Sequence, residues 1–333
     1  MILARPHDGL LRIHLRSARK PSRRTSPAFR RGLLLLATWV GAGACSTTRD
    51  LLGTIGGAAD AGGDGAGDGR FLVTPRFATP VLVASISDPM ADDEDPSFTG
   101  DLRELYFSST RAGGSDIWVS RRANPGDPWG TPGMVTELSS SGIDRSPSVS
   151  FDGLAVWLAS DREPFRGRIW RSTRPNRLAA WNPPAPVSEL ASPNFDTAPS
   201  VDAAETTMFF SSQRQQTPTG IDIYSSTRPV VGAPWGTPER IAGLDTLLDE
   251  SDPFVAVGGL VVFFTLSRTN QPGDLYWSRR QSTDAPFPAP QALVDVNSPF
   301  IDADATLSVD LLYLMFASNR SGNTEIYESH ALQ

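Results

Sequence analysis

Short runs of apolar and aromatic residues alternate with polar, turn-forming residues along most of this chain. Five of these runs end alike, in an apolar or aromatic residue, three intervening positions and an arginine. They are residues 107–111 (FSSTR), 158–162 (LASDR), 210–214 (FSSQR), 264–268 (FTLSR) and 316–320 (FASNR). Successive arginines lie 51, 52, 54 and 52 residues apart, which chance does not produce. The spacing identifies an internal repeat of about fifty residues.

Other elements recur with the same step, and each repeat predicts four short strands separated by turns such as 151–153 (FDG). An element related to Asp-Pro-Ser starts the first strand, at 95–98, 146–149, 198–201, 252–255 and 304–307. The third strand carries an Ile-Trp/Tyr element, and a Trp-x-x-Pro element precedes the fourth, at 129–132, 181–184, 235–238 and 287–290. A four-stranded antiparallel sheet repeated at this interval is typical of a β-propeller blade.

The two ends of the repeat array complement each other. The last repeat stops after its third strand, near Tyr327, whereas 77–80 (FATP) matches the Trp-x-x-Pro element and lies 52 residues before Trp129. Residues 81–85 then supply a fourth strand. Because an open array leaves strand edges unpaired, we expect the N-terminal strand to complete the C-terminal blade. The prediction is an all-β protein with a five-bladed propeller of four-stranded antiparallel blades.

The repeat resembles the PD40, or WD40-like, β-propeller repeats of the TolB family. The closest copy runs from Ser146 to Trp170 and contains Pro-Ser-Val-Ser-Phe-Asp-Gly, then Asp161-Arg162, then Ile169-Trp170. The resemblance covers about residues 77–327 and implies the fold more than a function. TolB has six such blades and an additional N-terminal domain, whereas this chain predicts five blades and a tether. The partnership of TolB is therefore not carried over whole.

The N-terminal segment resembles a targeting signal. Basic residues precede the apolar run 32–44, and the only cysteine, Cys45, follows Ala42-Gly43-Ala44. This resembles a bacterial lipobox, which implies lipidation of Cys45, although the family usually has Leu at the place of Ala42. A plain signal peptide with a chance cysteine is the alternative. The Arg-rich extension before the run resembles a twin-arginine signal weakly, and a start codon assigned too early explains it equally well.

These features divide the chain into a signal peptide with lipobox (1–45), a flexible Gly/Ala/Asp-rich tether (46–70) and the propeller (71–333). We expect an exported protein, lipid-anchored to the cell envelope and most simply to the outer membrane, facing the periplasm or the cell surface. Residues 1–44 hold nine of the 30 Lys and Arg and one of the 37 Asp and Glu. The remainder therefore has 21 basic and 36 acidic residues, a net charge of −15, which argues against nucleic acid and against a membrane contact other than the anchor.

Two sets of repeated charged residues are candidates for a site. Aspartates at the connections between blades predict a carboxylate ring at one channel mouth, able to bind a cation or basic groups: Asp95, Asp144, Asp196, Asp249 and Asp302. The alternative, which we prefer, is that each aspartate caps its own loop. The repeated arginines, which we interpret as structural ties between loops, are Arg111, Arg162, Arg214, Arg268 and Arg320.

The sequence offers few residues suited to catalysis or metal binding. Calcium is the one ion considered, at Asp92-Asp93-Glu94-Asp95, but the spacing does not fit an EF-hand and we interpret the segment, like Asp302 and Asp304, as solvated loop. His330 is the only histidine after residue 45, so neither a Ser-His-Asp triad nor a zinc site is expected. No phosphate-binding loop is evident. We assign no catalytic residue, no metal and no cofactor.

The preferred hypothesis is a monomeric binding module that recruits an envelope protein or polysaccharide at one face of the channel. The alternative is a carboxylate-dependent, glycan-active enzyme, because five-bladed glycosidases need only acidic residues. A purely structural envelope protein is a third reading of the same features.

Overall fold

The computed structural model describes residues 74–164, 167–215, 220–268 and 271–332. The predicted signal peptide, the lipobox cysteine Cys45 and the tether lie outside the described residues. Among the residues described, no helix has the length and apolar character needed to cross a membrane. The regular structure consists of β-strands and two short 3-10 turns, η2 (Ser188–Leu190) and η3 (Val257–Gly259).

Four blades follow one another along the chain, each an antiparallel sheet whose strands pair in sequence order. The first consists of β2 (Asp93–Phe98), β3 (Glu104–Ser109), β4 (Asp116–Arg121) and β5 (Gly133–Met134), and the second of β6 (Asp144–Val149), β7 (Ala155–Ser160), β8 (Arg168–Thr173) and β9 (Ala185–Pro186). The third consists of β10 (Asp196–Val201), β11 (Thr207–Ser212), β12 (Asp222–Thr227) and β13 (Glu239–Arg240), and the fourth of β14 (Asp249–Ala256), β15 (Val261–Ser267), β16 (Asp274–Arg279) and β17 (Gln291–Ala292).

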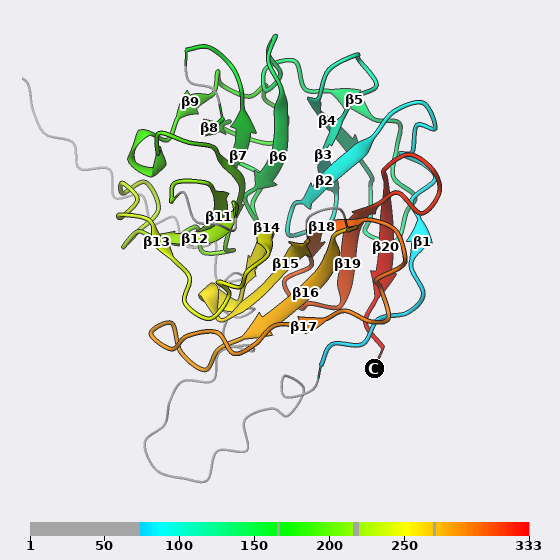
Figure 1. Cartoon of the computed structure of the whole chain (residues 1–333). Coiled ribbons are helices and arrows are strands. Elements are labelled where there is room, and N and C mark those ends of the chain that lie inside the picture. Colours follow the sequence, from blue (N-terminus) through cyan, green and yellow to red (C-terminus); the bar gives the residue numbers. More distant parts are fainter. Residues whose placement is uncertain (1–73, 165–166, 216–219, 269–270, 333) are drawn as a thin grey trace, which may run out of the picture. The chain divides into compact units, whose positions relative to one another are not determined.

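The fifth blade joins the two ends of the propeller. Its strands are β18 (Asp302–Leu307), β19 (Tyr313–Ser318), β20 (Glu325–His330) and β1 (Val81–Leu82), in the order β18-β19-β20-β1. Val81 pairs with Glu328 and Leu82 with Tyr327, and a further bridge joins Phe77 to Ala331. The blades surround a central channel with β2, β6, β10, β14 and β18 innermost (Figure 1). The predicted five-bladed fold and its closure by the N-terminal strand are confirmed.

The apolar core lies between adjacent blades. One cluster joins Tyr106 of the first blade to Trp170 and Trp181 of the second, and the clusters at the other blade junctions are likewise built of aliphatic and aromatic side chains from two adjacent blades. Hydroxyl groups connect the inner strands of neighbouring blades, because the backbone N–H of Val149 donates to Ser97 Oγ at 3.0 Å and that of Val201 to Ser148 Oγ at 3.2 Å. The repeated serines thus join blade to blade in the place where the blades converge.

Each inner strand carries a bulge, at the position before the repeated proline in four blades and before Ala305 in the fifth. There the register with the second strand shifts, and the bulged residue has a positive φ, near +50°. The five bulged residues are Asp95, Ser146, Ala198, Asp252 and Asp304. A left-handed backbone in a non-glycine residue costs of order 1 kcal/mol. The bulge places one side chain of each blade at the channel.

Closure of the ring can be tested at Phe77, which is 2% exposed within the core cluster between the fourth and fifth blades. We expect Phe77→Ala to lower the free energy of unfolding by about 3–5 kcal/mol, because it leaves a cavity in this core. Val81→Ala, at a 60% exposed position in the same segment, is the control and should change stability by less than about 0.5 kcal/mol. Urea unfolding measures both, and equal effects would contradict the closure.

Candidate functional site

Buried aspartates mark the start of four inner strands. Asp144 Oδ2 accepts hydrogen bonds from the backbone N–H and hydroxyl of Ser140, and Oδ1 accepts from Ser160 Oγ and from Arg162 at 2.6 Å. The same ion pair joins Arg111 to Asp93, Arg214 to Asp196 and Arg320 to Asp302. All four aspartates are fully buried. The pairs tie each blade to the connection before it.

The fourth blade departs from this pattern. Glu250 and Leu266 occupy the places of Asp196 and Ser212, and Arg268 is exposed and forms no ion pair within the described residues. Glu250 is fully buried, and only its Oε1 has hydrogen-bond partners there, both in Thr246. Burial raises the pKa of Glu250 to about 7. This carboxyl therefore lacks the counter-ion that the other blades provide.

The carboxylate ring considered at these positions is wrong, and the preferred alternative, in which each aspartate accepts hydrogen bonds from its own loop, holds for Asp144, Asp196 and Asp302. Asp144, Asp196 and Asp302 are buried in ion pairs, and Asp249 lies one residue before the equivalent position, where Oδ1 accepts the N–H of Ile221 at 3.1 Å. Of the five predicted aspartates, only Asp95 lines the channel. The acidic segment 92–95 is also not a solvated loop, because β2 begins at Asp93 and burial removes Asp93 from solvent. The predicted positions were assigned from their place on the connection between blades. The residue that faces the channel is instead the one at the bulge of each inner strand.

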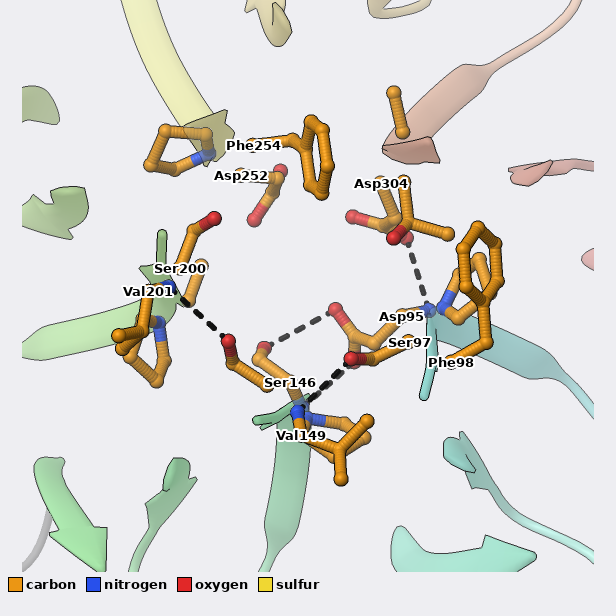
Figure 2. A pocket seen from close by; sticks show the side chains of 18 of the residues that line it. Asp95, Ser97, Phe98, Ser146, Val149, Ser200, Val201, Asp252, Phe254 and Asp304 are labelled. Carbon is orange, nitrogen blue, oxygen red and sulfur yellow. Dashed lines mark hydrogen bonds between the residues drawn. The ribbon is translucent and has the colours of Figure 1, made fainter. Parts of the chain in front are cut away.

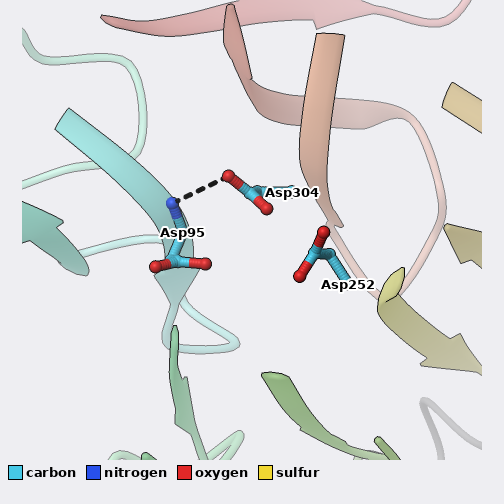
Figure 3. A group of neighbouring side chains, drawn as sticks. All are labelled: Asp95, Asp252 and Asp304. Atoms are coloured by element: carbon cyan, nitrogen blue, oxygen red, sulfur yellow. Dashed lines mark hydrogen bonds between the residues drawn. The ribbon is translucent and has the colours of Figure 1, made fainter. Parts of the chain in front are cut away.

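Three bulged aspartates converge in the channel instead. The side chains of Asp95, Asp252 and Asp304 point toward one another from β2, β14 and β18, and their nearest oxygens lie within 4.8 Å of one another (Figures 2 and 3). Asp95 also accepts hydrogen bonds from the N–H of Ser146 at 3.0 Å and from Ser108 Oγ at 2.7 Å. In the sequence Asp252 belongs to the repeated element at 252–255, and its place there indicates no site.

The cluster resists full ionisation. Burial and the neighbouring Asp95 raise the pKa of Asp252 to about 6, and burial together with the other carboxylates raises the pKa of Asp304 well above its ordinary value. Glu94 lies next to them, and burial first, then Asp95, raise its pKa to about 7. The guanidinium of Arg145 opposes the shifts in Glu94 and Asp252. Carboxyl groups thus dominate this end of the channel, and a cation there would be favoured.

The channel is narrow. Its cavity measures about 90 Å³, and below the aspartates its wall is apolar, with Phe98, Val149, Val201 and Leu307. Pockets for small organic molecules usually measure roughly 300–1,000 Å³. The interior therefore fits a side-chain ammonium or guanidinium group, or a metal ion, better than a sugar ring. The spacing of the three oxygens also matches a divalent cation bound to oxygen at about 2.3–2.6 Å.

Exposed apolar side chains surround the same end of the channel. They lie on the connections that lead from the outer strand of one blade to the inner strand of the next, which together form what we call the mouth face. Each connection contributes at least one: Met90, Ile143, Phe195, Leu247, Phe300 and Ile301. Met90 and Leu247 are almost fully exposed, at 89% and 88%. The mouth face thus combines an acidic centre with apolar side chains from all five blades.

The fold defines the chain as a five-bladed β-propeller, and comparisons with known proteins support that class. No family model matches the chain, and no curated protein matches it. Among solved structures, the GH62 α-L-arabinofuranosidase catalytic domain of Coprinopsis cinerea superposes with a TM-score of 0.54 and 13% identity over 77% of this chain and 97% of that chain. An α-L-arabinofuranosidase of Podospora anserina gives 0.53 and 11% over 78% and 98%.

A putative TolB of Agrobacterium tumefaciens is also similar, with a TM-score of 0.46 and 16% identity over 74% of this chain and 79% of that chain. The similarity to the two arabinofuranosidases, at 13% and 11% identity, establishes the propeller fold alone and leaves the chemistry of the channel to its own residues.

Burial of Asp252, together with repulsion from Asp95, predicts a stability gain at Asp252→Asn. In the folded protein the pKa of Asp252 is about 6, above its ordinary 3.8, so the folded state binds the proton more tightly than the unfolded state does. Stability should fall as pH rises from 4 to 6, and the variant should be more stable by of order 2 kcal/mol at pH 8 and by little at pH 3.5.

Thermal and urea unfolding across this pH range measure the gain. Asp284→Asn, at an exposed loop position, is the control. A gain at pH 8 no larger than that of the control would show that the three carboxylates do not repel one another.

Proposed function

We propose that this protein is a binding module that docks a polypeptide on its mouth face, with a basic side chain of the partner entering the acidic channel. The observation that carries the proposal is the combination of Asp95, Asp252 and Asp304 at the centre with an exposed apolar side chain on every connection around it. Protein interfaces use desolvated apolar contacts for affinity, and complementary charge for orientation and association rate.

The charge balance of the chain supports a basic partner. Residues 45–333 carry 21 basic and 36 acidic groups, so long-range attraction favours cationic surfaces. Arginine and lysine also have the size for the 90 Å³ channel, with an alkyl stem that can pass the apolar rim. A polymer of neutral sugars would satisfy neither the charge nor the volume of the channel.

We further propose that the module works in the cell envelope. The support comes from the sequence, in the apolar run 32–44, the lipobox-like Ala42-Gly43-Ala44-Cys45 and the Gly/Ala/Asp-rich segment that follows. Lipidation of Cys45 would hold the propeller at a membrane surface through a tether long enough for it to reach a neighbouring protein.

Selection from a random peptide library against the purified full chain tests the docking proposal. We expect the selected peptides to share an arginine or lysine flanked by apolar residues, with binding that weakens as salt is raised. Asp252→Asn combined with Asp304→Asn should weaken a selected peptide about tenfold or more in fluorescence anisotropy, because it removes the charge at the centre.

A pair of matched leucine variants locates the contact. Leu247→Ser on the mouth face should weaken binding several-fold. Leu178→Ser alters a 99% exposed leucine between β8 and β9, at the opposite end of the blade, and should have no effect. Peptides without a basic residue, or equal losses in the two leucine variants, would contradict docking at the mouth face.

A second candidate function, a glycan-active enzyme, is favoured by one observation. Glu94 and Asp252 have pKa values raised to about 7 and about 6 beside Asp95, so a proton donor and an acceptor can coexist near neutral pH. Propellers that share this fold include α-L-arabinofuranosidases. Because the channel is narrow, a glycan would have to react at the mouth.

This candidate predicts that the purified chain releases reducing sugar from at least one member of a panel of plant and bacterial polysaccharides. Asp252→Asn should then abolish release and Asp284→Asn should not. The absence of release from the whole panel, with a known glycosidase as positive control, rejects the enzyme.

A further inference from the structure

A second cavity, of about 580 Å³, opens at the junction between the fifth blade and the first. Its walls come from β1 and the turn after it, from β19 and β20, and from the connection between β4 and β5. This last connection, like the start of β19, lies at the end of the blades opposite the mouth face. We call the cavity the junction cleft. It shares no residue with the channel, so what it binds is independent of the proposed docking function.

The junction cleft is lined by polar groups set among aromatic ones. Tyr313 Oη donates a hydrogen bond to Glu328, and the rings of Tyr313 and His330 lie 5.0 Å apart. Burial, and then the Glu328 carboxylate, raise the pKa of Tyr313, so its hydroxyl keeps its proton. Arg122, which also lines the cleft, lies over the ring of Trp129, 3.9 Å from its centroid. The cleft thus combines acceptors, donors and ring surfaces.

The next blade junction differs from the junction cleft in how its arginine is paired. Between the first and second blades, Arg174 covers Trp181 and also forms a buried ion pair with Glu104, which in addition binds Arg121. The corresponding arginine of the junction cleft, Arg122, donates to the carbonyl oxygens of Leu102 and Asp127, as Arg174 does to those of Gly153 and Arg177, but forms no ion pair within the described residues.

The surroundings of Glu328 therefore differ from those of Glu104. Within the described residues it forms no ion pair, and its hydrogen-bond partner is the neutral hydroxyl of Tyr313. The carboxylate keeps acceptor capacity that faces the cavity. An acid of this kind, without an arginine across from it, is a group that a ligand with hydroxyl donors can use.

We propose that the junction cleft binds a saccharide of one or two rings. Its volume lies within the roughly 300–1,000 Å³ of small-molecule sites. Its charged groups include both signs, Glu328 and Asp127 beside Arg122, so the cleft disfavours an anion and offers both charged donors and charged acceptors. A hydroxyl group both donates and accepts, which suits the alternation of Glu328, Tyr313, His330 and Arg122. The apolar faces of a sugar ring can lie against Leu82 and the aromatic wall.

Titration calorimetry on the full chain tests the proposal, with maltose, cellobiose, xylobiose, chitobiose and their monosaccharides as probes. We expect saturable binding of at least one probe with a single site per chain. Glu328→Gln keeps the size of the side chain and should weaken that binding about tenfold, because a hydrogen bond to a charged acceptor is lost. Ala84→Phe places a ring into the cleft from an exposed wall position and should abolish it.

Two controls separate the cleft from the channel. Glu137→Gln changes an exposed glutamate outside the cleft, and Asp252→Asn changes the channel cluster, so both should bind like the wild type. Near-UV circular dichroism checks that each variant is folded, and Ala84→Phe carries the test if Glu328→Gln does not fold. The proposal is overturned if no probe binds saturably, if Ala84→Phe or folded Glu328→Gln binds like the wild type, or if Asp252→Asn abolishes binding.

Discussion

The pairing of β1 with β20 is the constraint on which the rest of the propeller depends. Only two residues of β1 are in the ladder, yet they bring Phe77 into the core between the fourth and fifth blades and set one wall of the junction cleft. Closure from the other end of the chain gives the fifth blade its fourth, outermost strand, so that β20 is paired on both sides. It also makes the channel a ring of five fixed positions, and three carboxylates can be held close together only because the ring cannot widen to separate them.

Within that ring the bulge of each inner strand decides which side chains face the channel. The bulged backbone aims one side chain per blade at the axis, so the chemistry of the channel is set by five residues and can vary without change to the fold. Here three of the five are aspartates on the first, fourth and fifth blades, and Ser146 and Ala198 complete the circle. The cost appears in the raised pKa values of Asp252 and Asp304, and such groups at the mouth of a cavity are typical of sites that bind or react.

The period of the sequence was sufficient to predict the blades, their number and the closing strand, because each repeat must bury the same aromatic face against its neighbour. It was not sufficient to predict the site. Asp144 and Asp302 recur with the fold because they pair with Arg162 and Arg320, so recurrence marked the structural acids. The channel acids interrupt the repeat, as Asp252 does where the second blade has Ser146. A one-residue bulge reverses which side of the strand a residue faces, and its position could not be read from alternation alone.

The departures of the fourth blade have a mechanical consequence. Among the described residues Glu250 has no counter-ion. Leu266 replaces the serine that ties the other blades, and Phe254 replaces the serine hydroxyl that joins one inner strand to the next. Within the described residues the fourth blade thus lacks the Arg–Asp ion pair that ties the other four blades to the preceding connection, and local opening of a protein starts where such ties are missing. Because this blade also supplies Asp252, we expect local opening of the propeller to begin beside the acidic cluster of its channel.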